Sequence, residues 1–228
     1  NLPLAWSKKK LGKTGIEVSA IGFGGATLGD LNEKLEDKIC YETLQNARMN
    51  DINFFDTSPF YGYGLSEHRL GNYLKSIKRE DFILCTKVGR YMTPEDPDKI
   101  DRGLFKGGLN FSPTVDYSYD GVMRSFEQSL FRLGLSKIDI CLIHDVDKFT
   151  FGSEVDYYFK LAMKGAYKAI QKLKDEINSS SSVIVAHYAG LSVLETDNLR
   201  KEMRDNGAKF KVTKNRLTKL ALADTPYE

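Results

Sequence analysis

The chain has 228 residues and a formal net charge of +2, with 41% hydrophobic and 28% charged residues. That is the composition of an ordinary globular protein, long enough for one large domain or two small ones. No apolar run approaches the ~20 residues that a membrane span needs, and residues 1–8 lack the basic-then-apolar order of a signal peptide. We therefore expect a cytoplasmic protein that makes no contact with a membrane.

The cysteines support this expectation. There are three, Cys40, Cys85 and Cys141, an odd number without the spacing of a metal site. Two of them lie inside apolar runs, which indicates buried free thiols. Free thiols are typical of a reducing compartment.

Strand-like and helix-like segments alternate along the first three quarters of the chain. Short apolar runs indicate strands, and apolar residues at a spacing of three and four indicate amphipathic helices. The expected elements are strands over 20–26, 52–56, 81–88 and 138–144 and helices over 35–50, 66–77, 119–133 and 157–174. Residues 90–118, rich in Pro, Gly and Asp, are expected to form a long loop on the substrate side. This order predicts a parallel sheet with crossover helices.

Polar residues at the strand ends distinguish between two parallel folds. Asp56, Lys87 and His144 lie at or just after the carboxyl ends of three different strands, where (β/α)8 barrels collect their catalytic groups. A Rossmann fold requires G-x-G-x-x-G after its first strand, and the glycines from Gly22 to Gly29 do not have that spacing. The barrel is therefore the preferred interpretation.

Four motifs, in order, resemble the aldo-keto reductase family. The most specific is the segment around Asp56-Thr57, in which a Tyr-Gly pair follows the Asp by five residues at Tyr61. The others match the family's amino-terminal hairpin and first strand, its lysine strand, and the helix and strand before its histidine; they span residues 10–25, 84–87 and 125–147. The variants Gly-Leu-Ser-Glu at 64–67 and His-Asp-Val-Asp at 144–147 are most similar to the aldose and galactose 1-dehydrogenases of the family.

The resemblance implies a fold, a cofactor and a site. Residues 1–177 would form an incomplete (β/α)8 barrel of the TIM type, about its first four β/α units, within an α/β protein. The implied cofactor is NAD or NADP, and the implied substrate is an aldose or another aldehyde. The implied catalytic residues are Asp56, Tyr61, Lys87 and His144, and the implied cofactor-binding residues are Gly25, Ala26, Thr27 and Asp56.

The chemistry of these side chains agrees with that implication. Hydride transfer to or from a carbonyl needs a proton donor or acceptor at the oxygen, and Tyr61 can serve. A free tyrosine has a pKa near 10, which the ammonium of Lys87 would lower by stabilising the phenolate. Asp56 would hold the ammonium, and His144 would orient the substrate oxygen. Taken singly, each residue is more often structural, and it is the shared order of all four that favours function.

A metal site is not expected. Asp145 and Asp147 follow His144 closely, but adjacent residues at a strand end diverge and no further ligands cluster there.

The last quarter of the chain departs from the family. Residues 178–228 carry eight Lys/Arg and six Asp/Glu, so the whole net charge of +2 resides there. Ile177-Asn-Ser-Ser-Ser-Ser182 stands where the family has a turn and a fifth strand, and a whole barrel takes about 250 residues. We therefore expect the cofactor walls to be incomplete and turnover to be impaired.

Residues 178–228 resemble instead the amino-terminal domain of a bacterial ribosomal stalk-base protein, as a small α/β fragment. Residues 207–223 hold five Lys/Arg and no acid, which suits contact with ribosomal RNA through Lys211, Lys214 and Arg216. The alternative is a solvated basic helix face. The two resemblances meet near residues 173–177, which indicates a chimera of two partial genes, either natural or an assembly artefact. A non-functional fragment with exposed barrel edges is the remaining alternative.

Overall fold

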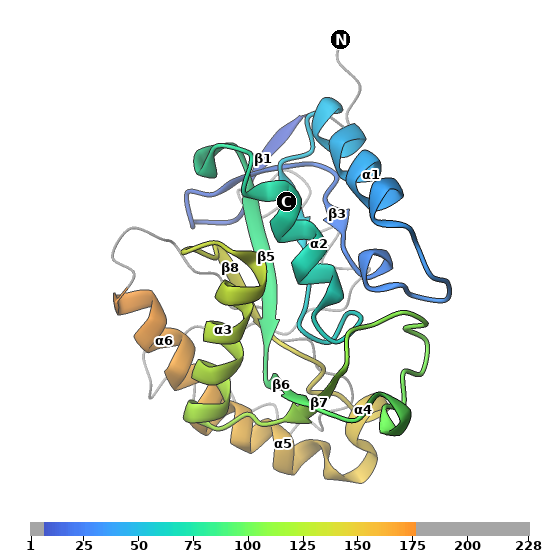
Figure 1. Ribbon diagram of the computed structural model, residues 1–228. Coiled ribbons are helices and arrows are strands. Elements are labelled where there is room, and N and C mark those ends of the chain that lie inside the picture. The colour runs from blue at the N-terminus through green and yellow to red at the C-terminus, as the bar shows by residue number, and fades with distance from the viewer. Residues whose placement is uncertain (1–6, 177–228) are drawn as a thin grey trace.

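The centre of the protein is a parallel sheet with helices between its strands, in a computed structural model that describes residues 7–176 (Figure 1). Its four strands follow the order β3, β4, β5, β8, so each lies beside the next sheet strand along the chain. They are β3 (Phe23–Gly24), β4 (Phe54–Asp56), β5 (Ile83–Val88) and β8 (Ile140–Ile143). Parallel neighbours require a crossover between them, and a helix supplies each one. The predicted α/β class and strand–helix alternation are confirmed.

The strands differ in length from the apolar runs that predicted them. β3 has two residues, whereas the run predicted a strand over 20–26. Glycines have no side chain to pack and weaken a strand, which explains this shortening. β5 is the longest, and it is buried from Leu84 to Val88. Continuous burial is expected of a parallel strand that is covered on both faces.

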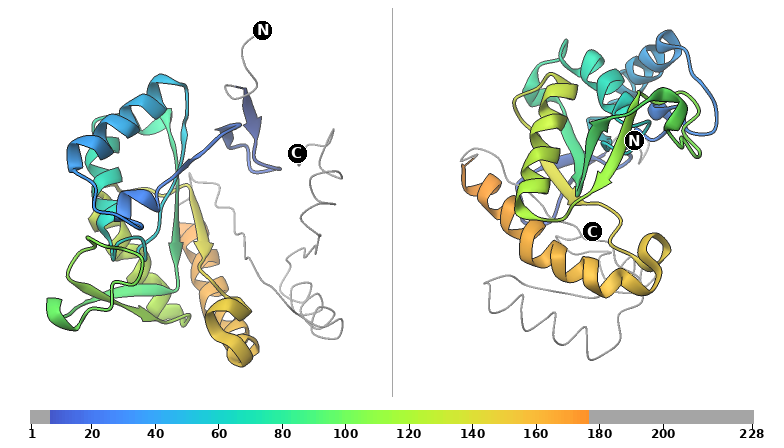
Figure 2. Two further views of the ribbon diagram at one scale, coloured as in Figure 1. Left: turned by 90° about the vertical axis from the view of Figure 1, so that its right-hand side faces the viewer. Right: turned by 60° about the horizontal axis from the view of Figure 1, so that its bottom comes forward.

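Three amphipathic helices lie close to their predicted positions. They are α1 (Asp37–Met49), α2 (Leu65–Leu74) and α3 (Tyr119–Leu133), and neighbouring helices contact each other in that order. Figure 2 shows α1 and α2 on one side of the sheet. The Ser118 side chain caps α3 at its start, and Gly134 ends it with a φ of 64°. The core between these helices and the sheet includes Leu44, Phe55, Leu70, Leu84, Val122 and Ile170.

The segment after β8 is more broken than the predicted helix over 157–174. It consists of α4 (Lys148–Phe151), α5 (Val155–Leu161), a π-helical turn (Ala162–Ala166) and α6 (Tyr167–Glu176). Gly165 packs against the backbone of Tyr117 and Ser118, where a Cβ would lie 2.4 Å from the Tyr117 carbonyl oxygen. The π turn therefore occurs where the helix meets the start of α3. Short 3₁₀ helices occupy Thr27–Gly29, Arg79–Asp81, Pro97–Lys99 and Gly152–Glu154.

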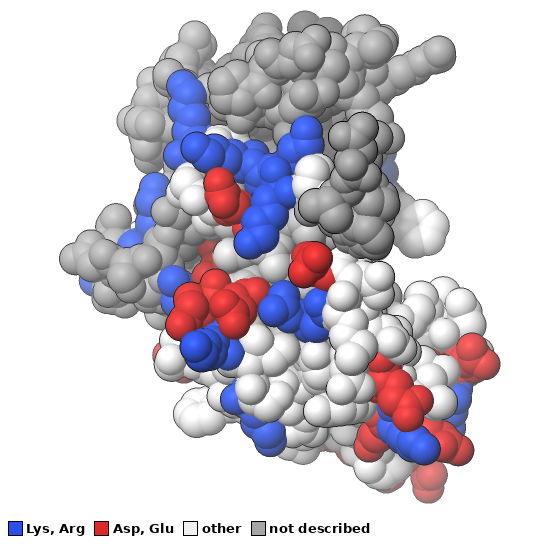
Figure 3. Space-filling model, turned by 90° about the horizontal axis from the view of Figure 1, so that it is seen from above, with Lys and Arg blue, Asp and Glu red and all other residues white. Residues whose placement is uncertain are grey.

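An antiparallel hairpin precedes the sheet. β1 (Lys8–Lys10) pairs with β2 (Glu17–Ser19), as the family resemblance implied. All three lysines of β1 are exposed, and Figure 3 shows basic side chains gathered at this end of the molecule. Figure 1 shows that β5 runs away from the hairpin, so this basic end lies opposite the carboxyl ends of the strands.

The predicted loop over 90–118 is partly wrong. Within it, β6 (Arg90–Pro94) and β7 (Phe111–Val115) form a two-stranded antiparallel sheet. Pro113 lies in β7, which is possible because a two-stranded sheet consists only of edge strands. The Pro, Gly and Asp content indicated irregular structure, but it applies only to the segment between the two strands.

Two other expectations concern the whole chain. Cys40, Cys85 and Cys141 are free and buried, as predicted. None of the helices in residues 7–176 is long and apolar enough to cross a membrane. The barrel truncation, the division at residue 177 and the small α/β fragment over 178–228 stay predictions, since residues 177–228 lie outside the part that the structure describes.

Candidate active site

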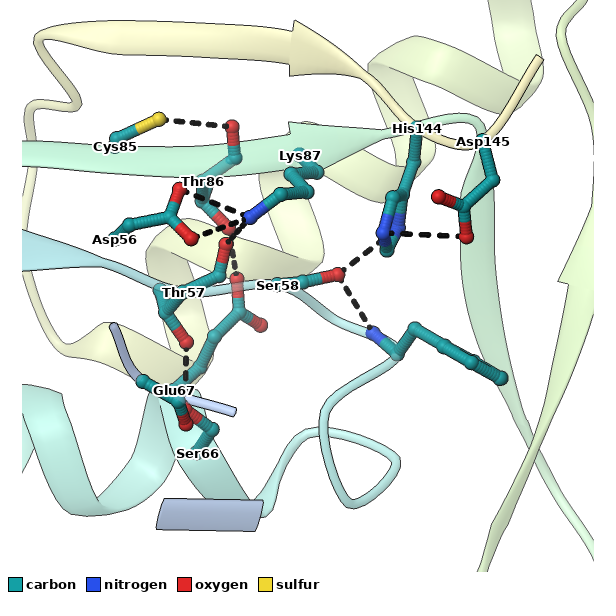
Figure 4. A network of polar contacts seen from close by, with 12 residues as sticks. Asp56, Thr57, Ser58, Ser66, Glu67, Cys85, Thr86, Lys87, His144 and Asp145 are labelled. Carbon is teal, nitrogen blue, oxygen red and sulfur yellow. Dashed lines mark hydrogen bonds and ion pairs between the residues drawn. The ribbon is translucent and has the colours of Figure 1, made fainter. Parts of the chain in front are cut away.

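The four predicted catalytic residues lie at or after the carboxyl ends of three neighbouring strands. Asp56 ends β4, Lys87 lies one residue before the end of β5, and His144 follows β8 directly. Tyr61 lies in the turn between β4 and α2. Because parallel strands end at one edge of their sheet, the side chains of Asp56, Lys87 and His144 come together there (Figure 4).

The ammonium of Lys87 is fixed by three oxygen atoms. Its Nζ donates to Asp56 Oδ2 at 2.7 Å, to Asp56 Oδ1 at 2.9 Å and to the carbonyl oxygen of Thr57 at 2.8 Å. Burial on its own lowers the pKa of Lys87, but the charges of Asp56 and Tyr61 raise it above the ordinary value. Lys87 is therefore a permanent, immobile positive charge at neutral pH.

The ring of Tyr61 is close to this cation and to the histidine. Lys87 Nζ is 4.7 Å from the centre of the Tyr61 ring, a cation–π distance. The ring centres of Tyr61 and His144 are 6.0 Å apart, at an interplanar angle of 84°. The aromatic ring of Tyr61 is thus close to both the ammonium and the imidazole.

The turn that carries Tyr61 is held by a close backbone contact. A Cβ on Gly29 would lie 2.5 Å from the carbonyl carbon of Tyr61, so only glycine fits there. The neighbouring Gly62 has a φ of 64°, which also favours glycine. The Tyr61 ring further contacts Phe105, with 6.2 Å between ring centres. The sequence did not identify Gly29 or Phe105, since each contacts Tyr61 only in the folded chain, Gly29 through its backbone and Phe105 through its ring.

His144 is buried and neutral. Its backbone nitrogen donates to the Val88 carbonyl oxygen at 3.0 Å, and the Tyr117 hydroxyl donates to the His144 carbonyl oxygen. Burial, followed by the positive charges of Arg90 and Lys87, lowers the pKa of His144 to about 2. A neutral imidazole can donate one hydrogen bond but cannot deliver a proton as imidazolium. Of these two side chains, Tyr61 is the one whose chemistry permits proton transfer.

Three residues beside His144 were not predicted as part of the site. Ser58 Oγ is 3.1 Å from His144 Nδ1, and Asp145 Oδ2 is 3.4 Å from Nε2. Arg90, from β6, donates to the same Asp145 oxygen at 2.9 Å. Asp145 adopts a φ of 49°, a left-handed conformation that is unusual for a residue with a side chain. Its position directly after His144 in the sequence could have indicated that Asp145 belongs to the site, but we considered it there only as a metal ligand.

The predicted cofactor-binding residues are placed at the same edge of the sheet. Gly25 N donates to the Asp56 carbonyl oxygen at 2.7 Å, and a Cβ on Gly25 would lie 2.6 Å from that oxygen. Ala26 and Thr27 follow and start the 3₁₀ helix, where Thr27 is exposed. These residues form a tight, glycine-dependent turn beside Asp56.

Two further groups of residues were considered from the sequence, the acidic residues after His144 and the basic residues of the last quarter. Asp147 caps α4 by accepting from Thr150 N at 2.8 Å, and no group of three potential metal ligands occurs among residues 7–176. Lys211, Lys214 and Arg216, the predicted RNA-binding residues, lie outside the described residues.

The fold and the site together define a class of protein. A fixed ammonium, a carboxylate, a phenol and a neutral imidazole can transfer a proton and bind an oxygen atom, but none of these side chains can accept or give a hydride. Such a set of side chains forms an oxidoreductase site only together with a bound hydride carrier, such as a nicotinamide cofactor.

Comparison with known proteins identifies the family. The profile described as "Aldo/keto reductase family" matches residues 20–218, and the chain belongs to this family. It is 39% identical over 181 residues to pyridoxal 4-dehydrogenase of Microbacterium luteolum, covering 75% of this chain and 52% of that protein. It is 31% identical over 196 residues to D-threo-aldose 1-dehydrogenase of a Pseudomonas species, covering 84% and 55%. The chain spans about half the length of these curated relatives.

Solved structures support the fold. An aldo-keto reductase from Bacillus halodurans superposes with a TM-score of 0.60 at 24% identity, covering 88% of this chain and 54% of that one. At this identity the likeness concerns the fold alone.

The ribosomal resemblance also has a counterpart. The large ribosomal subunit protein uL10 of Rhodospirillum rubrum is 53% identical over 62 residues, covering 25% of this chain and 36% of that protein. The aldo/keto reductase profile extends to residue 218, into the segment for which the sequence predicts the ribosomal likeness. The boundary at residue 177 therefore stays a prediction.

Proposed function

We propose that this protein is an NAD- or NADP-dependent oxidoreductase that oxidises an aldose at its anomeric hydroxyl to a lactone. The observation that carries the proposal is the contact of Tyr61 with both Lys87 and His144 at the carboxyl ends of the strands. The similarity to D-threo-aldose 1-dehydrogenase supports the choice of an aldose. The similarity to pyridoxal 4-dehydrogenase makes pyridoxal the comparison substrate.

The side chains divide the reaction between them. In the oxidative direction Tyr61 accepts the proton of the anomeric hydroxyl, and the positive charge of Lys87 favours the phenolate that must take it up. Asp56 keeps the ammonium next to the phenol through two hydrogen bonds, at 2.7 and 2.9 Å. His144, being neutral, donates a hydrogen bond to the reacting oxygen and orients it. NAD or NADP, when bound, supplies the hydride acceptor.

The cofactor proposal rests on the chain's own residues as well. Gly25, Ala26 and Thr27 form a turn whose first residue donates to the Asp56 carbonyl oxygen, and Thr27 is exposed at this edge of the sheet. We propose that these residues and Asp56 line the nicotinamide side of the site.

The test is an assay of dinucleotide reduction with a panel of aldoses and with pyridoxal. Because the cofactor walls are expected to be incomplete, the proposal predicts slow but saturable reduction of NAD or NADP with an aldose, and a lactone as the product, identified by NMR. Turnover of pyridoxal with no aldose turned over would contradict the choice of substrate. Absence of any dinucleotide reduction would contradict the function itself.

A second function is proposed for residues 178–228, because uL10 similarity covers a quarter of the chain. We propose that this segment contacts ribosomal RNA through Lys211, Lys214 and Arg216. Binding should weaken with salt, since neutralising phosphates releases counterions. Replacing all three residues with alanine should lower the affinity and the salt dependence. Tight binding that survives this replacement would contradict the proposal.

The two modules are proposed to meet near residues 173–177 as a chimera. Amplification of the source DNA across codons 165–190 tests whether the junction is natural. One continuous product in independent isolates would contradict an assembly artefact.

A further inference from the structure

A neutral histidine carries its single proton on one of its two nitrogen atoms, and the choice decides what it can donate. With the proton on Nε2, His144 can donate from Nε2 to a substrate oxygen. With the proton on Nδ1, Nε2 can only accept. The residues that contact the two nitrogen atoms determine the choice. Figure 4 shows Ser58 on one side of the imidazole and Asp145 on the other.

Ser58 is a donor toward Nδ1. Its hydroxyl is fully buried, and its oxygen already accepts a hydrogen bond from the Phe60 backbone nitrogen at 3.1 Å. A buried hydroxyl proton needs an acceptor of its own. In the described part of the chain, the acceptor within reach is His144 Nδ1, at 3.1 Å. A nitrogen that accepts from Ser58 has no proton.

Asp145 favours a proton on Nε2. Its carboxylate oxygen is 3.4 Å from Nε2 and accepts a hydrogen bond from Arg90 at 2.9 Å. A carboxylate held by a guanidinium is an acceptor only, so it is best faced by an N–H. His144 is neutral, so this contact at 3.4 Å is neither an ion pair nor one of the hydrogen bonds of the structure. The negative charge of Asp145 favours the proton on Nε2 and leaves that N–H free to donate elsewhere.

We propose that Ser58 is a positioning residue that fixes the tautomer of His144, with the proton on Nε2. Asp145, itself held by Arg90, supports this tautomer from the opposite side. The Nε2–H is then available to the oxygen of a substrate, a consequence that rests on the proposed oxidoreductase function. Ser58 does not touch the reacting atoms and acts only through His144.

The test is ¹⁵N NMR of the full chain with labelled histidine. The chain has three histidines, and His144→Gln assigns the signals of His144 by their loss. We expect a pyridine-type shift for Nδ1 and a pyrrole-type shift for Nε2, both constant from about pH 5 to 8 because His144 stays neutral. A pyrrole-type Nδ1 would overturn the proposal. This spectrum needs neither cofactor nor activity, so it is independent of the proposed function.

Ser58→Ala should move both shifts toward the average of the two tautomers. Ser129→Ala is the matched control, since Ser129 is also a fully buried serine, on α3, whose hydroxyl contacts Arg132 and not His144. It should leave both shifts unchanged. Unchanged shifts in Ser58→Ala would overturn the role of Ser58. If that variant does not fold, the wild-type spectrum still decides the tautomer.

Steady-state kinetics distinguish a positioning role of Ser58 from a purely structural one. Ser58→Ala should lower kcat about two- to tenfold, the effect of one ordinary hydrogen bond, while KM changes little. An unchanged kcat beside an altered tautomer would overturn the catalytic consequence. A wild-type chain with the expected tautomer but no turnover would contradict the proposed function and leave the tautomer assignment standing.

Discussion

Two polar clusters lie on opposite faces of β5 and differ in how completely the protein satisfies them. Thr86 and Lys87 are adjacent, so their side chains point to opposite faces. Thr86 donates to Glu67 Oε1 at 2.7 Å, and Arg132 donates to Glu67 Oε2 at 2.6 Å, with Glu67 fully buried. In the other cluster, the Lys87 and Asp56 side chains are 11% and 30% exposed.

The difference in burial indicates that one cluster serves stability and the other serves the reaction. The Glu67 cluster is closed, because both carboxylate oxygens have partners from the protein and no solvent reaches them; it ties α2 to β5 and α3. The Lys87 cluster is open, because the Asp56 side chain is 30% exposed, and it lies beside the rings of Tyr61 and His144. We expect changes in the closed cluster to affect stability and changes in the open cluster to affect rate.

The largest effect is expected in the open cluster. Lys87→Met should lower kcat by about 10²–10⁴-fold, since the phenolate of Tyr61 loses its stabilising charge. The measurement is steady-state dinucleotide reduction with saturating aldose. A loss below threefold would show that the ammonium does not assist proton transfer.

Removing the carboxylate from the closed cluster should cost stability. Glu67→Ala leaves the guanidinium of Arg132 buried without its partner, so the free energy of unfolding should fall by about 3–5 kcal/mol. Urea denaturation measures this fall. At temperatures where the variant remains folded, kcat should be close to that of the wild type; a large loss of kcat would contradict the division between the clusters.

The buried histidine should make stability depend on pH. Its pKa is about 2 in the folded chain and near 6.5 when unfolded. The unfolded state therefore binds more protons below pH 6.5, and stability falls as the pH falls from there toward 2. Between pH 7 and pH 5 this group should lower the free energy of unfolding by about 2 kcal/mol.

The variant His144→Gln isolates that contribution. Its loss of stability between pH 7 and pH 5 should be smaller than that of the wild type by about 2 kcal/mol. The exposed His68, changed to Gln, is the control and should keep the pH dependence of the wild type. Equal pH dependence in all three proteins would show that His144 is not buried in its neutral form.

The smallest effect is expected on the surface. Lys38 and Glu42 form an exposed ion pair at 3.8 Å on α1, with side chains 79% and 49% exposed. Lys38→Ala should change the free energy of unfolding by less than about 0.5 kcal/mol. A larger change, measured by urea denaturation, would contradict the expectation that exposed ion pairs contribute little to the free energy of unfolding.

The sequence predicted the features that depend on local patterns, such as apolar periodicity and the position of polar residues at strand ends. The helix over 119–133 was predicted with its observed bounds, because its apolar spacing and the capping Ser118 and Gly134 agree. The gathering of polar residues at one edge of the sheet followed from their places at strand ends, and Tyr61 was added by the family resemblance. The strands β6 and β7 were missed because their proline and polar residues do not alternate clearly with apolar ones.

Contacts between distant residues were not predictable in the same way. Ser58 meets His144 across 86 residues, and Arg90 meets Asp145 across 55. Nothing in the local pattern of either residue indicates its partner. The tautomer of His144 and the closed cluster around Glu67 depend on such contacts, so they required the structure.

The role of Tyr61 is tested most directly by comparing two tyrosines of one loop. Tyr61→Phe removes the hydroxyl of the ring that lies close to Lys87 and His144, whereas Tyr63→Phe removes a hydroxyl that donates to the Asp101 carbonyl oxygen. We predict that kcat for aldose oxidation falls about 10²–10⁴-fold in Tyr61→Phe and stays within about threefold of the wild type in Tyr63→Phe. Equal activity in Tyr61→Phe and the wild type would contradict the proposed function.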